Sequence, residues 1–169
     1  MSGYGLLLPK GVCVVDGWEA AEKATLLQLS VAVLDALLNT KDLDANVIDR
    51  HVSERATIFV RGPNEARWSA SSRAKMLEEF RLRAKLTPHH WTRMREDLSL
   101  VDMQGPRKAV VWLTAFSNAA GGNTLLREWE IRMQWRRRSF KDGAGGRWMC
   151  QSMEGVSMAG GPCDLFGLL

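Results

Sequence analysis

The residues with the clearest chemical potential lie on the segment 125–138, LLREWEIRMQWRRR. Apolar and charged side chains alternate along it, which is the period of a β-strand. A carboxylate in an apolar cavity becomes a usable acid or base near neutral pH, and an adjacent arginine can bind an oxyanion. We therefore select Glu130 as a candidate acid or base, and Arg132 as a candidate group that orients a substrate carbonyl.

Two arrangements of this strand are possible, and they have opposite consequences. If Glu130 faces a cavity, the apolar face looks away from the helices; that face comprises Trp129, Ile131, Met133 and Trp135. Such a face would not be left in water, so this arrangement predicts a homodimer through sheet-to-sheet contact. If the tryptophans face the helices instead, Glu130 is solvated, and the pocket chemistry comes from His90 and the helix residues. We favour the first arrangement.

Other polar residues are candidates with ordinary structural alternatives. His90 is the best-placed histidine for acid–base chemistry, and Asp35 is a candidate substrate contact whose alternative is a carboxylate at the boundary of a buried helix face. Arg50 and His51 lie near an expected cavity mouth, or simply form a polar helix end. The run Arg136–Arg138 ends a strand and is interpreted as solvated, with contact to nucleic acid or an anionic surface as the alternative.

The elements that must position these residues change character along the chain. Apolar spacing of three and four predicts helices over 18–38 and 69–86, with a short helix within 39–52 and a strand over 55–62. Four long strand-like segments follow, at 89–102, 107–119, 125–140 and 146–158, and short turns between them predict an antiparallel meander. Helices first and a meander afterwards indicate an α+β domain, whose curved sheet wraps around the helices and leaves a cone-shaped cavity.

This order of elements resembles the nuclear transport factor 2-like superfamily, which includes scytalone dehydratase and the SnoaL-like cyclases and isomerases. The resemblance covers about residues 20–157. Locally, Lys41 and Asp42 match the run that ends the first family helix, where Leu38 and Asn39 replace the pocket tyrosine and aspartate. His90 before Trp91 matches a catalytic histidine. The second family histidine is absent at 116–118, where Asn118 stands in its region.

The resemblance implies a fold and a class of activity. On the third long strand, the family's pocket serine and asparagine correspond to Glu130 and Arg132, so a different acid/base set is implied. The implied substrate contacts include Asn39 and Asn118. Trp112 is added because tryptophans suit a pocket or an oligomer interface.

Composition limits the remaining possibilities. A net charge of +4 over 169 residues does not demand a nucleic-acid partner. The longest uncharged run, 109–126, contains turn residues in its second half, so no membrane span is predicted. Three scattered cysteines, Cys13, Cys150 and Cys163, indicate reduced thiols in a cytoplasmic protein, and no spacing for a metal site or a cofactor motif is found.

We therefore expect an arm at 1–17, a domain at 18–158 and a tail at 159–169. The predicted function is that of a cofactor-independent isomerase, cyclase or dehydratase. It would act by acid–base catalysis on a mostly apolar natural-product intermediate, such as a polyketide, terpenoid or alkaloid. The alternative is a non-catalytic module for ligand binding or dimerisation.

Overall fold

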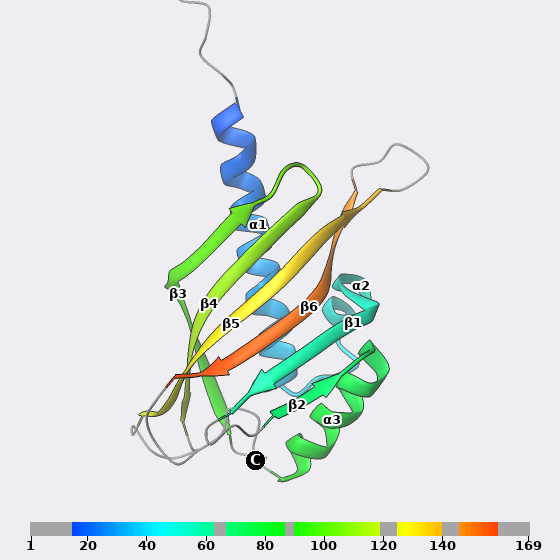
Figure 1. Ribbon diagram of the computed structural model, residues 1–169, viewed down its shortest axis with the longest axis vertical. Coiled ribbons are helices and arrows are strands. Elements are labelled where there is room, and N and C mark those ends of the chain that lie inside the picture. Colours follow the sequence, from blue (N-terminus) through cyan, green and yellow to red (C-terminus); the bar gives the residue numbers. More distant parts are fainter. Residues whose placement is uncertain (1–14, 63–66, 87–89, 119–124, 140–145, 159–169) are drawn as a thin grey trace, which may run out of the picture.

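The computed structural model describes residues 15–62, 67–86, 90–118, 125–139 and 146–158. The described residues form three helices and six strands, which are labelled in chain order in Figure 1. They are α1 (Val15–Leu38), α2 (Asn46–His51), β1 (Val52–Arg61), β2 (Arg67–Ala70), α3 (Arg73–Leu86), β3 (Trp91–Met103), β4 (Lys108–Asn118), β5 (Leu125–Arg138) and β6 (Arg147–Ser157). The predicted boundary at residue 18 falls inside α1. Nearly all of the predicted arm and the tail 159–169 lie outside the described residues.

All six strands form one sheet in the order β2-β1-β6-β5-β4-β3. Strands β3 to β6 pair antiparallel with their neighbours in sequence, so the predicted meander is confirmed. β1 lies parallel to β6, and β2 pairs antiparallel with the outer edge of β1. The short strand β2 was not predicted. The α+β class and the sheet curved around N-terminal helices are as expected from the sequence.

The helices cover one face of the sheet, which we call the inner face. In Figure 1, α1 runs behind the strands, while α3 lies beside β1 and β2. The spacing that predicted α1 also supplies its contacts, because Leu26, Val33 and Leu37 are buried. Ser72 caps α3, and its Oγ accepts a hydrogen bond of 3.3 Å from the backbone N–H of Lys75. The short helix α2 begins after Ala45 without a side-chain cap.

The inner face of β5 carries the tryptophans. Trp129 and Trp135 are 0% and 2% exposed. The Nε1–H of Trp135 donates a 3.0 Å hydrogen bond to the Oγ of Ser30 on α1. The favoured arrangement, with the tryptophans facing a second copy of the chain, is therefore wrong. Alternation separates the two faces of a strand, but it does not tell which face the helices cover.

Candidate functional site

Three predicted site residues lie together on the outer face, away from the helices. Glu130 is exposed on β5, and Arg132 forms an ion pair of 3.2 Å with Glu154 of β6. The guanidinium carbon of Arg132 also lies 5.3 Å from the ring centroid of Trp112 on β4. Glu130 and Trp112 line a shallow hollow of about 360 Å³ together with Leu98 and Leu100. The surroundings of Glu130 are therefore open, and not those of a carboxylate in a closed cone.

A second group of predicted residues lies where α1 ends against β3. The amide Nδ2 of Asn39 donates hydrogen bonds of 2.8 Å to the Oδ1 of Asp35 and to the backbone carbonyl of Thr92. The N–H of Thr92 donates in return to the Oδ1 of Asn39 at 2.7 Å. His90 is half-buried two residues before Thr92. Asn39 thus connects the end of α1 to the start of β3 through hydrogen bonds. The family resemblance implies a ligand contact at this same residue.

The buried hydroxyl group of Ser117 lies on the inner face next to this group. Ser117 faces Thr92 across the β3–β4 ladder and is fully buried. Within the part of the chain that the structure describes, its Oγ has no hydrogen-bond partner. Because an unpaired buried hydroxyl is costly, this position is suited to a small polar ligand or a water molecule.

Arg50 and His51 are separated from both groups. Arg50 is exposed in the last turn of α2, and His51 is half-buried, with its Nδ1 lying 3.0 Å from the carbonyl oxygen of Trp148. Asn118 ends β4 and faces Trp91 across the β3–β4 ladder, so it lies beside the second group, but its side chain lies outside the described residues. The structure therefore divides the predicted site among three places and does not bring Glu130, Arg132 and His90 together.

The largest of the pockets described here lies elsewhere and has a volume of about 810 Å³. It forms where the start of β1, the start of α3, the β3–β4 turn and the adjoining ends of β5 and β6 meet. Its lining residues are Asp49, Ser53, Glu54, Arg55, Arg73, Arg107, Arg136, Arg137, Arg138, Ser139, Arg147, Met149 and Gln151. Seven arginines thus stand against two carboxylates. We call this pocket the arginine pocket.

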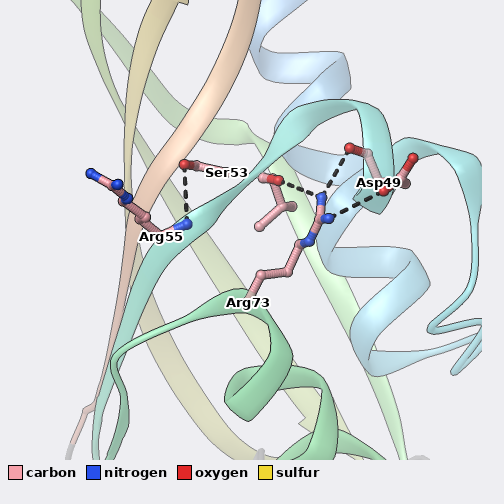
Figure 2. A network of polar contacts seen from close by, with 5 residues as sticks. Asp49, Ser53, Arg55 and Arg73 are labelled. Atoms are coloured by element: carbon pink, nitrogen blue, oxygen red, sulfur yellow. Dashed lines mark hydrogen bonds and ion pairs between the residues drawn. The ribbon is translucent and has the colours of Figure 1, made fainter.

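One of its arginines anchors the end of α2. Figure 2 shows Arg73 reaching from the start of α3 to the α2–β1 junction. Its Nη1 donates to the backbone carbonyl oxygens of Asp49 at 3.0 Å and Val52 at 2.9 Å, while its Nη2 lies 3.2 Å from the Asp49 carboxylate. These bonds satisfy carbonyls at the helix end and fix the start of β1, on which Ser53 and Arg55 stand.

A second arginine, Arg137, points to the inner side and is also committed. Its Nε donates a 2.8 Å hydrogen bond to the carbonyl of Gly146, and its Nη1 lies 3.4 Å from the carboxylate of Glu22 on α1. Glu22 in turn accepts a 2.6 Å hydrogen bond from the Nε1–H of Trp148. A Cβ at position 146 would lie 2.5 Å from the carbonyl oxygen of Arg138, so this close approach of β5 and β6 requires glycine.

Four arginines of the pocket remain uncommitted: Arg55, Arg107, Arg136 and Arg138. All four are exposed. Among the described residues, none of their guanidinium groups forms a hydrogen bond or an ion pair. The backbone N–H of Arg137 donates to the carbonyl of Arg107 at 2.9 Å, and this bond holds the β3–β4 turn beside the end of β5.

Strand register places like charges opposite one another beside the pocket. Lys108 faces Arg136 across the β4–β5 ladder, and Arg138 faces Arg147 across the β5–β6 ladder. Such facing pairs destabilise a sheet. A further pair, Arg61 and Arg67, faces across β1 and β2 outside the pocket. Facing charges alone therefore do not define the site. It is defined by the gathering in one pocket of Arg55, Arg107, Arg136 and Arg138, whose guanidinium groups have no partner among the described residues.

Only part of this site was recognisable from the sequence. The run Arg136–Arg138 was interpreted as a solvated strand end, with anion contact as the alternative. Arg55, Arg107 and Arg147 were not selected. Each of them stands near the end of a strand segment, but only the pairing of those ends brings them into one pocket.

Other kinds of site find less support among the described residues. Burial raises the pKa of the Cys150 thiol to about 12, so this cysteine is protonated near neutral pH and is not an activated nucleophile. No group of three or more histidine, cysteine, aspartate or glutamate side chains is arranged to hold a metal ion within the described ranges. None of the helices in those ranges is long and apolar enough to cross a membrane.

Comparison with known proteins identifies similarity through structure alone. No family model matches the chain, and no curated protein matches it significantly. An NTF2-like protein with a cystatin-like fold from Novosphingobium aromaticivorans superposes with a TM-score of 0.65 at 17% identity, covering 88% of this chain and 92% of that one. The chain therefore has the NTF2-like fold, as its resemblance predicted.

Two further structures have the same fold with different described roles. The CaMKII hub of S. rosetta superposes with a TM-score of 0.60 at 18% identity, covering 89% of this chain and 100% of that one. A candidate dehydratase of the NTF2-like family from Streptomyces avermitilis gives a TM-score of 0.57 at 16% identity, covering 83% of this chain and 99% of that one. At these identities the likeness establishes the fold and leaves the function open.

Proposed function

We propose that this chain of NTF2-like fold is a ligand-binding module that takes a multivalent anion in the arginine pocket. The observation that carries the proposal is the seven arginines around one pocket, four of which have no partner among the described residues. Guanidinium groups bind carboxylates and phosphates bidentately, so several of them around one hollow favour an anion with more than one charged group.

The facing charges of Lys108 and Arg136 support this proposal energetically, because neither side chain has an oppositely charged partner among the described residues. A local arrangement that lowers stability without a compensating contact is typical of a functional position. A bound anion would supply the compensation, because its negative charge would lie close to this pair.

The lining supports binding better than acid–base catalysis. Of its two carboxylates, Asp49 is ion-paired with Arg73, and Glu54 is exposed. Neither has the dry, apolar surroundings in which a carboxylate acts as a general acid or base near neutral pH.

The test is calorimetric titration of the full chain with citrate and with tripolyphosphate at low ionic strength. We expect at least one of them to bind, and the double variant Arg136→Glu/Arg138→Glu to bind it more than about tenfold more weakly, a change of about 1.4 kcal/mol. Both substitutions turn a like-charged facing pair into an opposite-charged one, so the fold should be preserved.

The matched control is Arg61→Glu, which reverses an exposed arginine at the other end of β1, outside the pocket. We expect it to change the affinity less than about threefold, because it alters net charge without touching the pocket. Absence of binding by the unmodified chain, or an equal loss in the Arg61 variant, would contradict the proposal.

A second candidate function is the predicted cofactor-independent isomerase, cyclase or dehydratase acting on an apolar natural-product intermediate. The observation that favours it is the buried hydroxyl of Ser117 opposite Thr92, which has no hydrogen-bond partner among the described residues and lies close to the Asp35–Asn39 pair. His90 would serve as the acid or base there. Glu130 and Arg132 have no part in this version, because they lie on the outer face.

This candidate is tested by assaying polyketide, terpenoid and alkaloid intermediates with the full chain and the variants His90→Gln and Ser117→Ala. We expect turnover to fall by a factor of about 100 or more in the first variant, the usual contribution of a general acid or base. The matched control is Arg132→Gln, on the opposite face. Unchanged turnover in both test variants would rule out this inner-face site.

Homodimerisation, predicted through the tryptophan face, is proposed here through the outer face instead. Exposed Leu98 and Leu100 surround the hollow that Trp112 and Glu130 also line, and this supports a contact there. Light scattering of the full chain and of Leu100→Lys tests it. A monomer at micromolar concentration would refute the dimer.

A further inference from the structure

The hydrogen-bonding capacity of the arginine pocket narrows the class of its ligand. Each of Arg55, Arg107, Arg136 and Arg138 presents five N–H donors, and within the described residues none of these is used by the protein. A ligand that displaces water from them must offer many acceptor oxygens. One phosphate group provides three strong acceptor oxygens and close to two negative charges, whereas a carboxylate provides two oxygens and one charge.

The size of the pocket favours a ligand larger than a single small ion. Its volume of about 810 Å³ is in the range of sites for whole small molecules, which is roughly 300 to 1,000 Å³. The uncommitted arginines come from β1, from the β3–β4 turn and from β5, so they approach the hollow from separate elements. A ligand with charged groups at several points can meet them together.

The described part of the lining offers no surface on which an aromatic ring could stack. Among the described lining residues none is aromatic, and the only large apolar side chain is Met149. The nearby ring of Trp148 is buried on the inner side, with the guanidinium carbon of Arg137 5.8 Å from its centroid. Many sites that hold nucleobases stack the base on exposed aromatic side chains, so the described lining is a poor match for a base.

Building on the proposed anion-binding function, we infer that the ligand carries several phosphate groups on a compact, non-aromatic scaffold. A phosphorylated polyol and a linear polyphosphate both have this chemistry, and so does the phosphorylated headgroup of an inositol lipid. Ser53 and Gln151 supply neutral hydrogen-bonding groups in the lining, which suit the hydroxyl or ester oxygens of such a scaffold.

The experiment is calorimetric titration of the full chain at fixed salt with inositol hexakisphosphate, tripolyphosphate, ATP, orthophosphate and citrate. We expect the first two to bind at least about tenfold more tightly than orthophosphate and citrate, and ATP to gain less than about tenfold over tripolyphosphate. We expect Arg55→Ala and Arg107→Ala each to weaken inositol hexakisphosphate at least fivefold, whereas Arg61→Ala should leave it unchanged.

The outcomes separate this inference from the proposed function. If citrate binds as tightly as tripolyphosphate, or if ATP binds more than tenfold better, the inference is overturned while anion binding stands. If no anion binds, both fail. Binding to phosphatidylcholine vesicles with and without phosphatidylinositol bisphosphate distinguishes a lipid headgroup from a free metabolite as the ligand. Vesicle binding that inositol hexakisphosphate competes away supports a headgroup, and binding of the soluble compounds alone supports a free metabolite.

Discussion

The inner face of β5 is dry, whereas its outer face and its end are wet and charged. On the inner side Trp129 and Trp135 are packed against the helices, and the polar atom of Trp135 is satisfied by Ser30. At the outer side Arg136 and Arg138 face other cations and water. The inner side chains of β5 thus stabilise the fold, whereas the arginines on its outer side face like charges. Substitutions on the two sides should therefore change stability and charge separately.

The largest expected effect concerns the dry side. Trp135→Ala should lower the free energy of unfolding by about 3 to 5 kcal/mol, the usual cost of truncating a buried tryptophan. Urea unfolding followed by circular dichroism measures this. Trp135→Phe is the control that keeps most of the ring volume and should cost less. A loss below about 1 kcal/mol in the alanine variant would mean that this side chain does not belong to the core.

A smaller effect comes from Cys150, which stands opposite Trp135 in the β5–β6 ladder. Burial raises the pKa of its thiol from 9.0 to about 12. The folded state therefore holds this proton more tightly than the unfolded state does. The resulting stability is complete below about pH 9 and is lost as pH rises toward 12, at up to about 1.4 kcal/mol per pH unit.

Unfolding by urea at pH 8, 9 and 10 should detect that slope. In Cys150→Ala the slope between pH 9 and 10 should be shallower, because the titrating thiol is gone. Identical pH profiles for the two proteins would indicate that water reaches the thiol.

The smallest expected effect concerns the outer, solvent-exposed side of β5, where a substitution should raise the free energy of unfolding. Arg136→Gln should stabilise the unliganded protein by about 0.2 to 1 kcal/mol at low salt, because it removes one member of the facing Lys108–Arg136 pair. Thermal unfolding in low and high salt measures the gain, which salt should suppress. Arg61→Gln, which relieves the pair Arg61–Arg67, should give a similar gain without weakening anion binding. A destabilised Arg136→Gln would show that Arg136 has a structural role.

The fold was predictable from local patterns, and the site was only partly so. The apolar spacing of α1 and the alternation along β3 to β6 depend on nearby residues, so these elements were expected and were found. The short strand β2 carries too few residues for a pattern. Which side of β5 meets α1 depends on contacts between distant segments, and the favoured arrangement of its tryptophans was wrong for that reason.

The arginine pocket could not be predicted for the same reason, because its lining residues are far apart along the chain. Its lining comes from residues 49–55, 73, 107, 136–139 and 147–151. Their meeting requires the register of β4, β5 and β6 and the parallel pairing of β1 with β6. Only the run Arg136–Arg138 was visible as a charge feature in the sequence, and it resembles any solvated strand end. Asn39 was selected through the family resemblance, and it lies in a hydrogen-bonded position between α1 and β3.

Because the arginine pocket joins segments that are remote in the chain, it exists only while those segments are assembled. The unfolded polypeptide would retain the arginines but not their arrangement. A compound that fits the pocket therefore binds the folded state and not the unfolded state. At a concentration of 100 times its Kd, such a compound adds about 2.7 kcal/mol to the free energy of unfolding. A rise in melting temperature is therefore a direct means of searching a metabolite library for the natural occupant, without knowledge of any reaction.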